Sequence, residues 1–457
     1  MSKRSYWSGT LAIMWAVGMI SIILTNLGIS DRHPLIISIL WFCAGTGIIL
    51  TGIWKLMEYN REKVIMTAAY VVRVLLLWFE LWTGNLLELK VNSLDWKMFG
   101  DYSKLLYVGY QNGNVDAYVH VLNAEYHVFG WNEFVARYIN IVCLMITLAI
   151  VYKIMKKLSV SGTYRWIGLG IVSFMPLGLI NSLALIRESM ITMLITLSFY
   201  CAVNWILRGK QRMMLYAIAA SVCAAVLHSG SLCIGVACVF LYAVYDNRTG
   251  RYKVKLQGVA ALIIIAVAAV VSFQIPSLRA SIWAKIPEAA DIIGSISRSY
   301  LVHRSEHGGS EYLETMNLTG WGDLILYTPI RMLYFLVAPM PMDWRGAKDI
   351  VMFFADSMLH ICVIVSIVKN IVFTKRFRWT KSPQEGRMDL EYRKGKSEYT
   401  AVILLVFITI VAMAIIFAWG TCSAGAAIRH RGKLVGLEAV VLTVFWSLPF
   451  RNKGILK

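Results

Sequence analysis

The amino-acid sequence predicts an all-α fold, a polytopic bundle of transmembrane helices, from three observations. Hydrophobic residues make up 58% of the 457 residues and charged residues 16%, whereas soluble domains carry about 25% charged residues. Apolar runs of about the 20 residues that cross a bilayer recur along the chain. The basic residues, which give a net charge of +19, lie mostly in short loops between these runs. This is the distribution of the positive-inside rule, and it does not indicate a nucleic-acid partner.

The first apolar run follows the basic start "MSKRSYW" and ends near Ile29. It is too long for a signal peptide, and no small-residue cleavage site follows it, so we expect a retained helix. In total we expect about twelve spans in a single integral membrane domain, residues 1–457. The predicted spans are 7–29, 35–54, 64–83, 134–153, 166–186, 189–207, 213–227, 230–245, 258–274, 350–369, 400–418 and 434–450.

The charge of the loops predicts the side of the membrane on which each one lies. The most basic loops fall on one side together with both termini, among them the loop 370–399. That side should be the cytoplasm. Two long loops, 84–133 and 275–349, then lie on the outer face. They share that face with short polar turns at Arg187-Glu188, at "HSG" (228–230) and at "GTCSAGAAIRHRGK" (420–433).

One apolar segment does not fit this alternation of sides. The run "LILYTPIRMLYFLVAPM", residues 324–340, is short and contains Pro329 and Arg331. As a span it would move the basic loop 370–399 to the outer face, so we expect a re-entrant or interfacial helix near 324–340. Irregular backbone at membrane depth is tolerated where it is buried in protein or lines a wet cavity. The alternative is an ordinary span, with another predicted span being wrong.

Basic side chains gather on the predicted outer face, against the positive-inside bias. They are Arg187, Arg298, Arg304, Arg429, His430 and Arg431. Guanidinium groups bind phosphate oxygens through paired donors, so these residues are candidates for binding a lipid-linked phosphate or pyrophosphate from the outer leaflet. Contact with ordinary anionic lipid head groups is the alternative. For Arg187 and its neighbour Glu188, snorkelling and mutual pairing are further alternatives.

Three residues on the predicted outer face are candidates for catalysis: Asp95, Glu188 and His228. Asp95 lies in the first outer loop, which also contains Asp101, Asp116 and many aromatic residues. A positioned carboxylate or imidazole can act as a general base, and aromatic rings can stack on sugar faces. The alternative for the loop is an amphipathic helix with interfacial aromatics. The alternative for His228 is simple hydrogen bonding near a helix end.

Charged residues also fall within or near the predicted spans. Arg73 and Arg137 are basic, and Glu80 and Asp356 are the acids that are candidates to pair with them. An ionisable residue at membrane depth is costly and indicates function by default. Structural salt bridges remain an equal alternative for these four residues.

The sequence predicts neither a metal site nor a cofactor. Seven of the eight cysteines lie in apolar segments without ligand spacing, and only Cys422 falls in a polar loop. Packing is therefore expected, rather than metal binding or a disulfide framework. The P-loop, HExxH, GxSxG and DxD motifs are absent, so ATP-driven transport, zinc proteolysis and serine hydrolysis lose support.

The run "FGDYSKLLYVGYQNGNVDAYVHVLNAEYHVFGWNEFVARYINIVCLMITLAIVYKIMKKL" resembles the first loop and following helix of the GT-C superfamily, the lipid-dependent membrane glycosyltransferases. In that group a short acidic motif precedes an "FG…R.iN" helix entry, and Asp95 is the best match to the acid. The segments "LALIRESMITML", "HRSEHGGSEYL" and "GAAIRHRGK" resemble bacterial polysaccharide polymerases of the Wzy and EpsG type, which are GT-C-like in fold. The chain shows no large soluble C-terminal domain like that of oligosaccharyltransferases and no clear paired-acid motif, which favours the polymerase.

The resemblance implies a polymerase that uses an undecaprenyl-pyrophosphate-linked oligosaccharide at the outer face. The acceptor hydroxyl would attack the anomeric carbon, and the arginines would stabilise the leaving pyrophosphate. It also implies membrane lipid and proteins of a polysaccharide assembly system as partners. The location would be a bacterial plasma membrane, with both termini cytoplasmic. Two alternatives are a single-sugar GT-C transferase that uses polyprenyl-phosphate-sugar, and a transporter or flippase for lipid-linked glycan. A transporter should carry its charges near mid-membrane, whereas these charges concentrate at one face.

Overall fold

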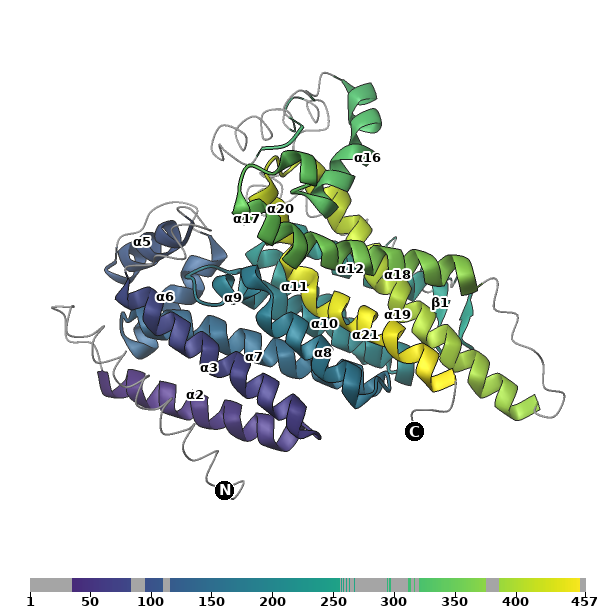
Figure 1. The fold of residues 1–457 in the computed structure, drawn as a ribbon, viewed down its shortest axis with the longest axis horizontal. Helices are drawn as coiled ribbons and strands as arrows, with labels where there is room; N and C mark the ends of the chain where they lie inside the picture. The colour runs from purple at the N-terminus through teal and green to yellow at the C-terminus, as the bar shows by residue number, and fades with distance from the viewer. Residues whose placement is uncertain are drawn as a thin grey trace. The chain divides into compact units, whose positions relative to one another are not determined.

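A computed structural model of the chain describes residues 35–83, 95–109, 116–254, 311–313, 316, 320–374 and 386–452, with isolated positions between 256 and 296. These residues are mostly helical (Figure 1). The protein is an integral membrane protein with an all-α polytopic fold, as the sequence predicts, while the number of spans stays a prediction. Six helices in the described part are long and apolar enough to cross a membrane: Ile39–Leu56, Asn60–Trp82, Glu133–Lys157, Glu188–Arg208, Ala347–Lys369 and Ser397–Ala418.

The chain divides into two compact units. Unit 1 comprises Met1–Thr196, Val226–His228 and Trp446–Lys457, and unit 2 comprises Leu197–Ala225 and Ser229–Phe445. Helices α10 (Glu188–Arg208) and α21 (Val435–Asn452) contribute residues to both units. A single membrane domain over residues 1–457 stays a prediction.

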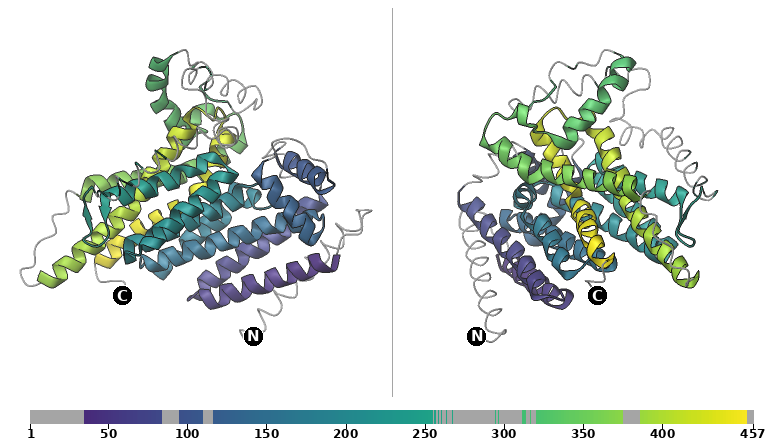
Figure 2. Two further views of the ribbon diagram at one scale, coloured as in Figure 1. Left: turned by 180° about the vertical axis from the view of Figure 1, so that it is seen from behind. Right: turned by 45° about the vertical axis from the view of Figure 1, so that its right-hand side comes forward.

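Helix α7 (Glu133–Lys157) is the most deeply buried long helix described in unit 1. Helices α2 (Leu35–Leu56), α3 (Asn60–Trp82) and α8 (Gly162–Phe174) contact it, and they lie side by side in all three views (Figures 1 and 2). The side chain of Asn132 begins α7 by accepting the N–H of Val135 at 3.2 Å, which satisfies an otherwise unpaired donor. Apolar surface alone does not hold helices together in lipid, so buried polar contacts specify this packing.

The predicted span 166–186 is interrupted in the structure. Helix α8 ends at Phe174, and a short helix, α9 (Pro176–Asn181), begins shortly after it. Proline lacks the N–H that would continue α8, but its fixed φ suits the first turn of a new helix. Residues 182–187 then form an irregular bend before α10 begins at Glu188. We call residues 182–187 the bend.

The predicted outer loop 84–133 contains two helices, α5 (Asp95–Tyr107) and α6 (Ala117–Phe129), which pack against each other. The carboxylate of Asp116 begins α6 by accepting the N–H of Tyr118 at 2.9 Å. On the apolar side of this pair, Phe99 packs edge-on against Tyr118, with ring centroids 5.4 Å apart. The helices therefore form a small layer of their own, joined to the start of α7 through Gly130–Asn132.

Unit 2 is built around α12 (Cys233–Val244) and α19 (Gly386–Ala418), which pack along each other. Both helices bury small residues, among them Ala237 and Ala414, and small residues allow membrane helices to approach closely. A short 3-10 helix, η1 (Ser229–Leu232), leads into α12. At its Gly230, an added Cβ would lie 2.3 Å from a ring carbon of Phe417. The remaining helices that lie in unit 2 include α11 (Gln211–Leu227), most of which belongs to it.

The predicted re-entrant segment 324–340 is helical as α16 (Trp321–Val337), with Pro329 inside the helix. Whether α16 is re-entrant stays a prediction. Its Arg331 is fully buried, donates from Nη2 to the carbonyl of Met316 at 2.6 Å, and lies 4.2 Å from the ring of Trp419. The charge within this apolar helix is thus accommodated by a carbonyl and an aromatic face.

After α16 come η4 (Pro341–Asp343), α17 (Ala347–Met352), a π-helical turn η5 (Phe353–Ser357) and α18 (Met358–Thr374). The chain ends with α20 (Ala424–Arg431), η6 (Gly432–Leu434) and α21. Two departures from the predicted loops stand out. A short hairpin, β1 (Tyr245–Asp246) with β2 (Arg251–Tyr252), follows α12. Helix α19 begins at Gly386, inside the predicted loop 370–399, where Glu, Arg and Lys favour helix.

Candidate functional site

The bend of unit 1 is fixed by a buried amide on α7. Asn140, which is fully buried, donates from Nδ2 to the carbonyls of Ala184 at 2.5 Å and Ile186 at 3.1 Å. The same nitrogen lies 3.2 Å from the hydroxyl of Tyr118 on α6. Carbonyls that leave a helix need new donors, and Asn140 supplies them. The irregular backbone before α10 is therefore held in one shape.

Two buried arginines hold the same bend from other sides. Arg73 on α3 donates from Nε to Ser182 Oγ at 3.0 Å and from Nη2 to the carbonyl of Ser173 at 2.6 Å. Arg137 on α7 donates from Nη1 to the carbonyl of Leu183 at 3.2 Å, while its Nη2 pairs with Glu133 at 2.5 Å. These contacts give both arginines a structural role at the bend.

Arg187 ends the bend and forms an ion pair with Asp116, the residue that begins α6. Arg187 Nη1 donates to Asp116 Oδ2, and Asp116 Oδ1 is held by the N–H of Tyr118. The guanidinium carbon lies 5.5 Å from the ring centre of Phe99. Both side chains are partly exposed, Arg187 by 19% and Asp116 by 27%. A cation and a carboxylate thus meet where solvent can reach both of them.

Glu188 follows directly as the first residue of α10 and is buried, with 4% exposure. A carboxylate in this position is stabilised by the helix dipole and the free N–H groups of the first turn. The sequence places Arg187 and Glu188 at a turn between two apolar segments, and the structure does the same. Their chemical roles stay predictions.

Another carboxyl on α6 is buried without a hydrogen-bond partner among the described residues. Glu125 on α6 is 7% exposed, and neither of its carboxyl oxygens has a hydrogen-bond partner among the described residues. Burial raises the pKa of Glu125 from 4.5 to about 8, because the charged form is disfavoured away from water. The side chain is therefore protonated at neutral pH.

In unit 2, Arg431 is an anchor within the protein rather than an exposed cation. Its Nε and Nη2 donate to Asp356 Oδ2 at 2.9 and 2.5 Å. Nη1 donates to the carbonyl of Phe335 at 2.5 Å, and Nη2 donates to that of Ala338 at 2.7 Å. Arg431 and Asp356 are each 1% exposed. A phosphate would reach Arg431 only if these bonds broke, so the geometry favours a structural role.

The ion pair continues into a buried row of polar groups. His360 lies 3.6 Å from Asp356 through Nε2 and 2.5 Å from Glu438 through Nδ1. On α20, His430 stacks on Phe417 with ring centroids 4.0 Å apart and lies 3.1 Å from Lys433 Nζ. The carboxylate at the π-helical turn therefore connects α18, α20 and α21. Turns of this kind recur at functional sites.

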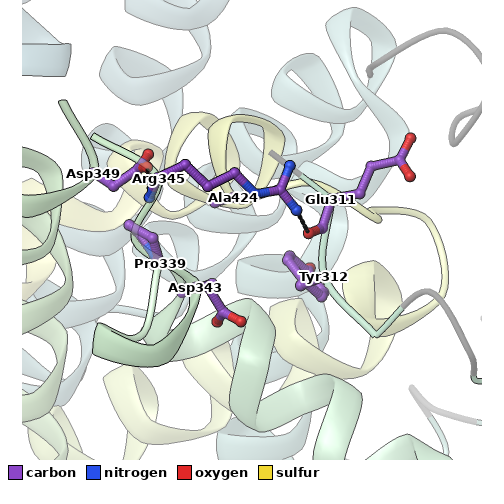
Figure 3. A pocket seen from close by; sticks show the side chains of 8 residues that line it. Glu311, Tyr312, Pro339, Asp343, Arg345, Asp349 and Ala424 are labelled. Atoms are coloured by element: carbon purple, nitrogen blue, oxygen red, sulfur yellow. Dashed lines mark hydrogen bonds between the residues drawn. The ribbon is translucent and has the colours of Figure 1, made fainter. Parts of the chain in front are cut away.

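A small pocket lies beside the start of α20 (Figure 3). Its cavity volume is about 10 Å³, the room of a single water. Arg345 crosses one side and donates to the carbonyl of Glu311 at 3.1 Å, and Asp343 lines the space. Burial raises the pKa of Asp343, whose Oδ2 has no hydrogen-bond partner among the described residues. The pocket suits one water or hydroxyl, and it is too small for a sugar ring.

The other predicted site residues are placed only in part. Asp95 begins α5, but its side chain lies outside the described residues, as do Arg298 and Arg304 entirely. His228 follows α11 and is half-buried, and Arg429 is half-buried on α20. Arg187 belongs to unit 1 and Arg429 to unit 2, so the gathering of these arginines in one cavity stays a prediction. Within the described ranges, no three His, Cys, Asp or Glu side chains are grouped so as to hold a metal ion.

The sequence identified the charged residues of these sites more often than the residues that they contact. It named Asp116 only as one of several acids, and it did not single out Asn140, His360 or Glu438. Arg137 and Asn140 stand three positions apart in "ARYIN", on one face of an otherwise apolar helix. Glu438 stands inside an apolar run. Polar residues within apolar runs are therefore the sequence feature that could have singled out Asn140 and Glu438.

A protein-family model matches part of the chain. The model of the dolichyl-phosphate-mannose-protein mannosyltransferase family matches residues 97–286, less than half of the chain. This match supports a GT-C-like membrane glycosyltransferase, and it carries nothing specific to polymerases of the Wzy or EpsG type. No curated protein and no solved structure matches the chain. The matched stretch contains Asp116, Asn140, the bend, Glu188 and His228, while Asp95 and α20 lie outside it.

Proposed function

We propose that this protein transfers a single sugar from a polyprenyl-phosphate carrier to a hydroxyl acceptor at the membrane surface. Arg187 binds the phosphate of the donor, and Asp116 is the general base. The observation that carries the proposal is the Arg187–Asp116 pair, partly exposed and rigidly supported on both sides. The pair lies inside the stretch matched by a family whose name specifies a lipid-phosphate sugar donor.

The reaction places two demands on the protein. The acceptor hydroxyl attacks the anomeric carbon, its proton passes to a carboxylate, and the bond from that carbon to the phosphate oxygen breaks. The departing polyprenyl phosphate gains one negative charge. A fixed guanidinium beside the phosphate stabilises that charge in the transition state, and a carboxylate within hydrogen-bond reach takes the proton. Arg187 and Asp116 have the residue types and the proximity that these two tasks need.

The remaining predicted residues keep subsidiary roles in the proposal. Glu188, at the start of α10, is a second candidate base, and Asp95 and His228 are further candidates for orienting the acceptor. Arg298, Arg304, Arg429 and His430 are candidates for contacts with other parts of the lipid-linked substrate. Arg431 is assigned to holding α20 through Asp356, because its donors are already bonded within the protein.

Mannose is the first sugar to test, since it is named in the description of the matched family. The polymerase hypothesis differs in its donor, a pyrophosphate-linked oligosaccharide, and in its product, a ladder of chain lengths. The transporter hypothesis differs in leaving the glycosidic bond intact. The length and the attachment of the product therefore separate the three functions.

The test uses the full chain in proteoliposomes with radiolabelled polyprenyl-phosphate-mannose and a panel of hydroxyl acceptors. We expect transfer of one sugar, and Arg187→Ala should lower kcat/KM by about 10²- to 10³-fold, the range for losing one preorganised donor. Arg208→Ala is the matched control, because Arg208 occupies the last turn of α10, the helix that begins directly after Arg187. Equal activity of the two variants would refute the role of Arg187. Movement of intact donor across the bilayer without transfer would favour the transporter.

A further inference from the structure

Arg187 and Asp116 occupy each other in the structure, which limits how each can contact a substrate. The guanidinium that is proposed to bind the donor phosphate already binds the carboxylate that is proposed to act as base. While Asp116 Oδ2 accepts a hydrogen bond from Arg187 Nη1, that oxygen is less available to take the proton of an acceptor hydroxyl. A phosphate on the same guanidinium has to compete with that carboxylate.

The surroundings limit how Arg187 can accommodate both anions. One face of its guanidinium is turned to Phe99, and the side chain is 19% exposed. The backbone of the bend is tied down by Asn140 at Ala184 and Ile186. The guanidinium of Arg187 is thus placed beside Asp116, and a phosphate that binds it there meets the carboxylate directly.

Asp116 stays in place when the pair opens. Its Oδ1 accepts the N–H of Tyr118 at 2.9 Å as the cap of α6, and this bond does not depend on Arg187. Only Oδ2 is engaged by the guanidinium. Opening the pair thus frees one carboxylate oxygen beside the bound phosphate, at the position where an acceptor hydroxyl would be deprotonated.

We propose that the donor phosphate and Asp116 compete for Arg187, so that donor binding releases Asp116 to act on the acceptor. The inference rests on the proposed function and adds an order to it: the donor binds first, and the base becomes available only afterwards. In the absence of donor, Asp116 Oδ2 remains bonded to Arg187. This suppresses deprotonation of acceptor hydroxyls when there is no donor sugar to attack.

Competition predicts that removing the carboxylate strengthens phosphate binding. Farnesyl phosphate is the probe, and its affinity for the purified full chain in detergent is measured by calorimetry without any sugar transfer. A partly exposed ion pair contributes about 0.2–1 kcal/mol, so Asp116→Asn should bind the probe about 1.4- to fivefold more tightly than the unaltered protein. Asp101→Asn is the matched control, since it removes an exposed carboxylate from the neighbouring helix α5, and it should leave the affinity unchanged.

A double-mutant cycle separates competition from repulsion between two anions. In an Arg187→Gln background, competition predicts that Asp116→Asn has no effect, whereas repulsion alone predicts the same gain as before. Arg187→Lys provides the background if the Gln variant binds too weakly to measure, and there the gain should shrink. Unchanged or weaker binding by Asp116→Asn would overturn the inference, as would a full gain without Arg187. Because binding of the probe requires no sugar transfer, this result is independent of the transfer assay that tests the proposed function.

Discussion

Replacing Asn140 by Leu removes the side chain that holds the bend while keeping a similar volume in the core of unit 1. Asn140 Nδ2 serves the carbonyls of Ala184 and Ile186 at 2.5 and 3.1 Å. Both acceptor residues are at most 1% exposed, so water cannot take over. The two carbonyls are therefore left without these donors in Asn140→Leu.

The magnitude is worked from those two bonds. A buried group left unsatisfied costs about 1–3 kcal/mol in soluble proteins, and polar bonds between membrane helices average about 0.6 kcal/mol. The loss of two bonds, each worth a value between these limits, should lower the unfolding free energy by about 2 kcal/mol. For a unit of this size, that lowers Tm by about 4–8 °C. The transfer activity should fall further than the stability, by at least about tenfold, because about 1.4 kcal/mol of lost positioning at Arg187 is a factor of ten in rate.

The assay measures Tm in detergent together with sugar transfer at a temperature where the variant remains folded. Asn204→Leu is the matched control. Asn204 is 5% exposed and donates to the carbonyl of Tyr200 at 2.7 Å, within its own helix, so its loss leaves the bend intact. If Asn140→Leu and Asn204→Leu gave the same Tm and the same activity, the account of the bend as the support of Arg187 would be wrong.

Three further predictions concern buried groups. Burial raises the pKa of Glu125 to about 8, so the folded state holds a proton that the unfolded state releases near pH 4.5. The unfolding free energy should therefore fall by up to about 1.4 kcal/mol per pH unit as the pH rises between these two values. Glu125→Gln should remove this slope when thermal unfolding is measured as a function of pH. Arg431→Met leaves Asp356 buried without its cation and should cost about 3–5 kcal/mol, whereas adding Asp356→Leu should recover much of the loss; an additive double variant would contradict this. Gly230→Ala places a Cβ 2.3 Å from an aromatic carbon and should cost about 1–3 kcal/mol in thermal unfolding, unlike Gly432→Ala, where a Cβ meets nothing within 4 Å.

The sequence was sufficient for features that depend on composition and on apolar length. Runs of apolar residues predict the all-α membrane fold. The interruption of such a run at Arg187-Glu188 predicts the turn before α10. Span boundaries were harder to predict where a run contained a local break. The predicted span 166–186 failed as one helix because Pro176 begins a new helix, and because polar groups of α3 and α7 hold the bend that comes after α9.

Pairings between distant residues could not be predicted in the same way. Arg187 meets Asp116 across 71 positions of sequence and Arg431 meets Asp356 across 75, and several acids were equally available to each arginine. Charge pattern alone favoured phosphate binding for every outer arginine. Arg431 is buried and its donors are bonded within the protein, whereas Arg187 is partly exposed; the predicted phosphate contacts of both stay predictions. Such distinctions depend on packing, which periodicity does not encode.

The central claim is that Arg187 binds the phosphate of a lipid-linked donor. It is tested most directly by determining the structure of the protein with polyprenyl phosphate bound. The account predicts that the phosphorus atom lies about 4 Å from the guanidinium carbon of Arg187, the distance of a charge-assisted contact, with Asp116 Oδ2 no longer bonded to that guanidinium. A phosphate bound elsewhere, with the Arg187–Asp116 pair intact, would contradict it.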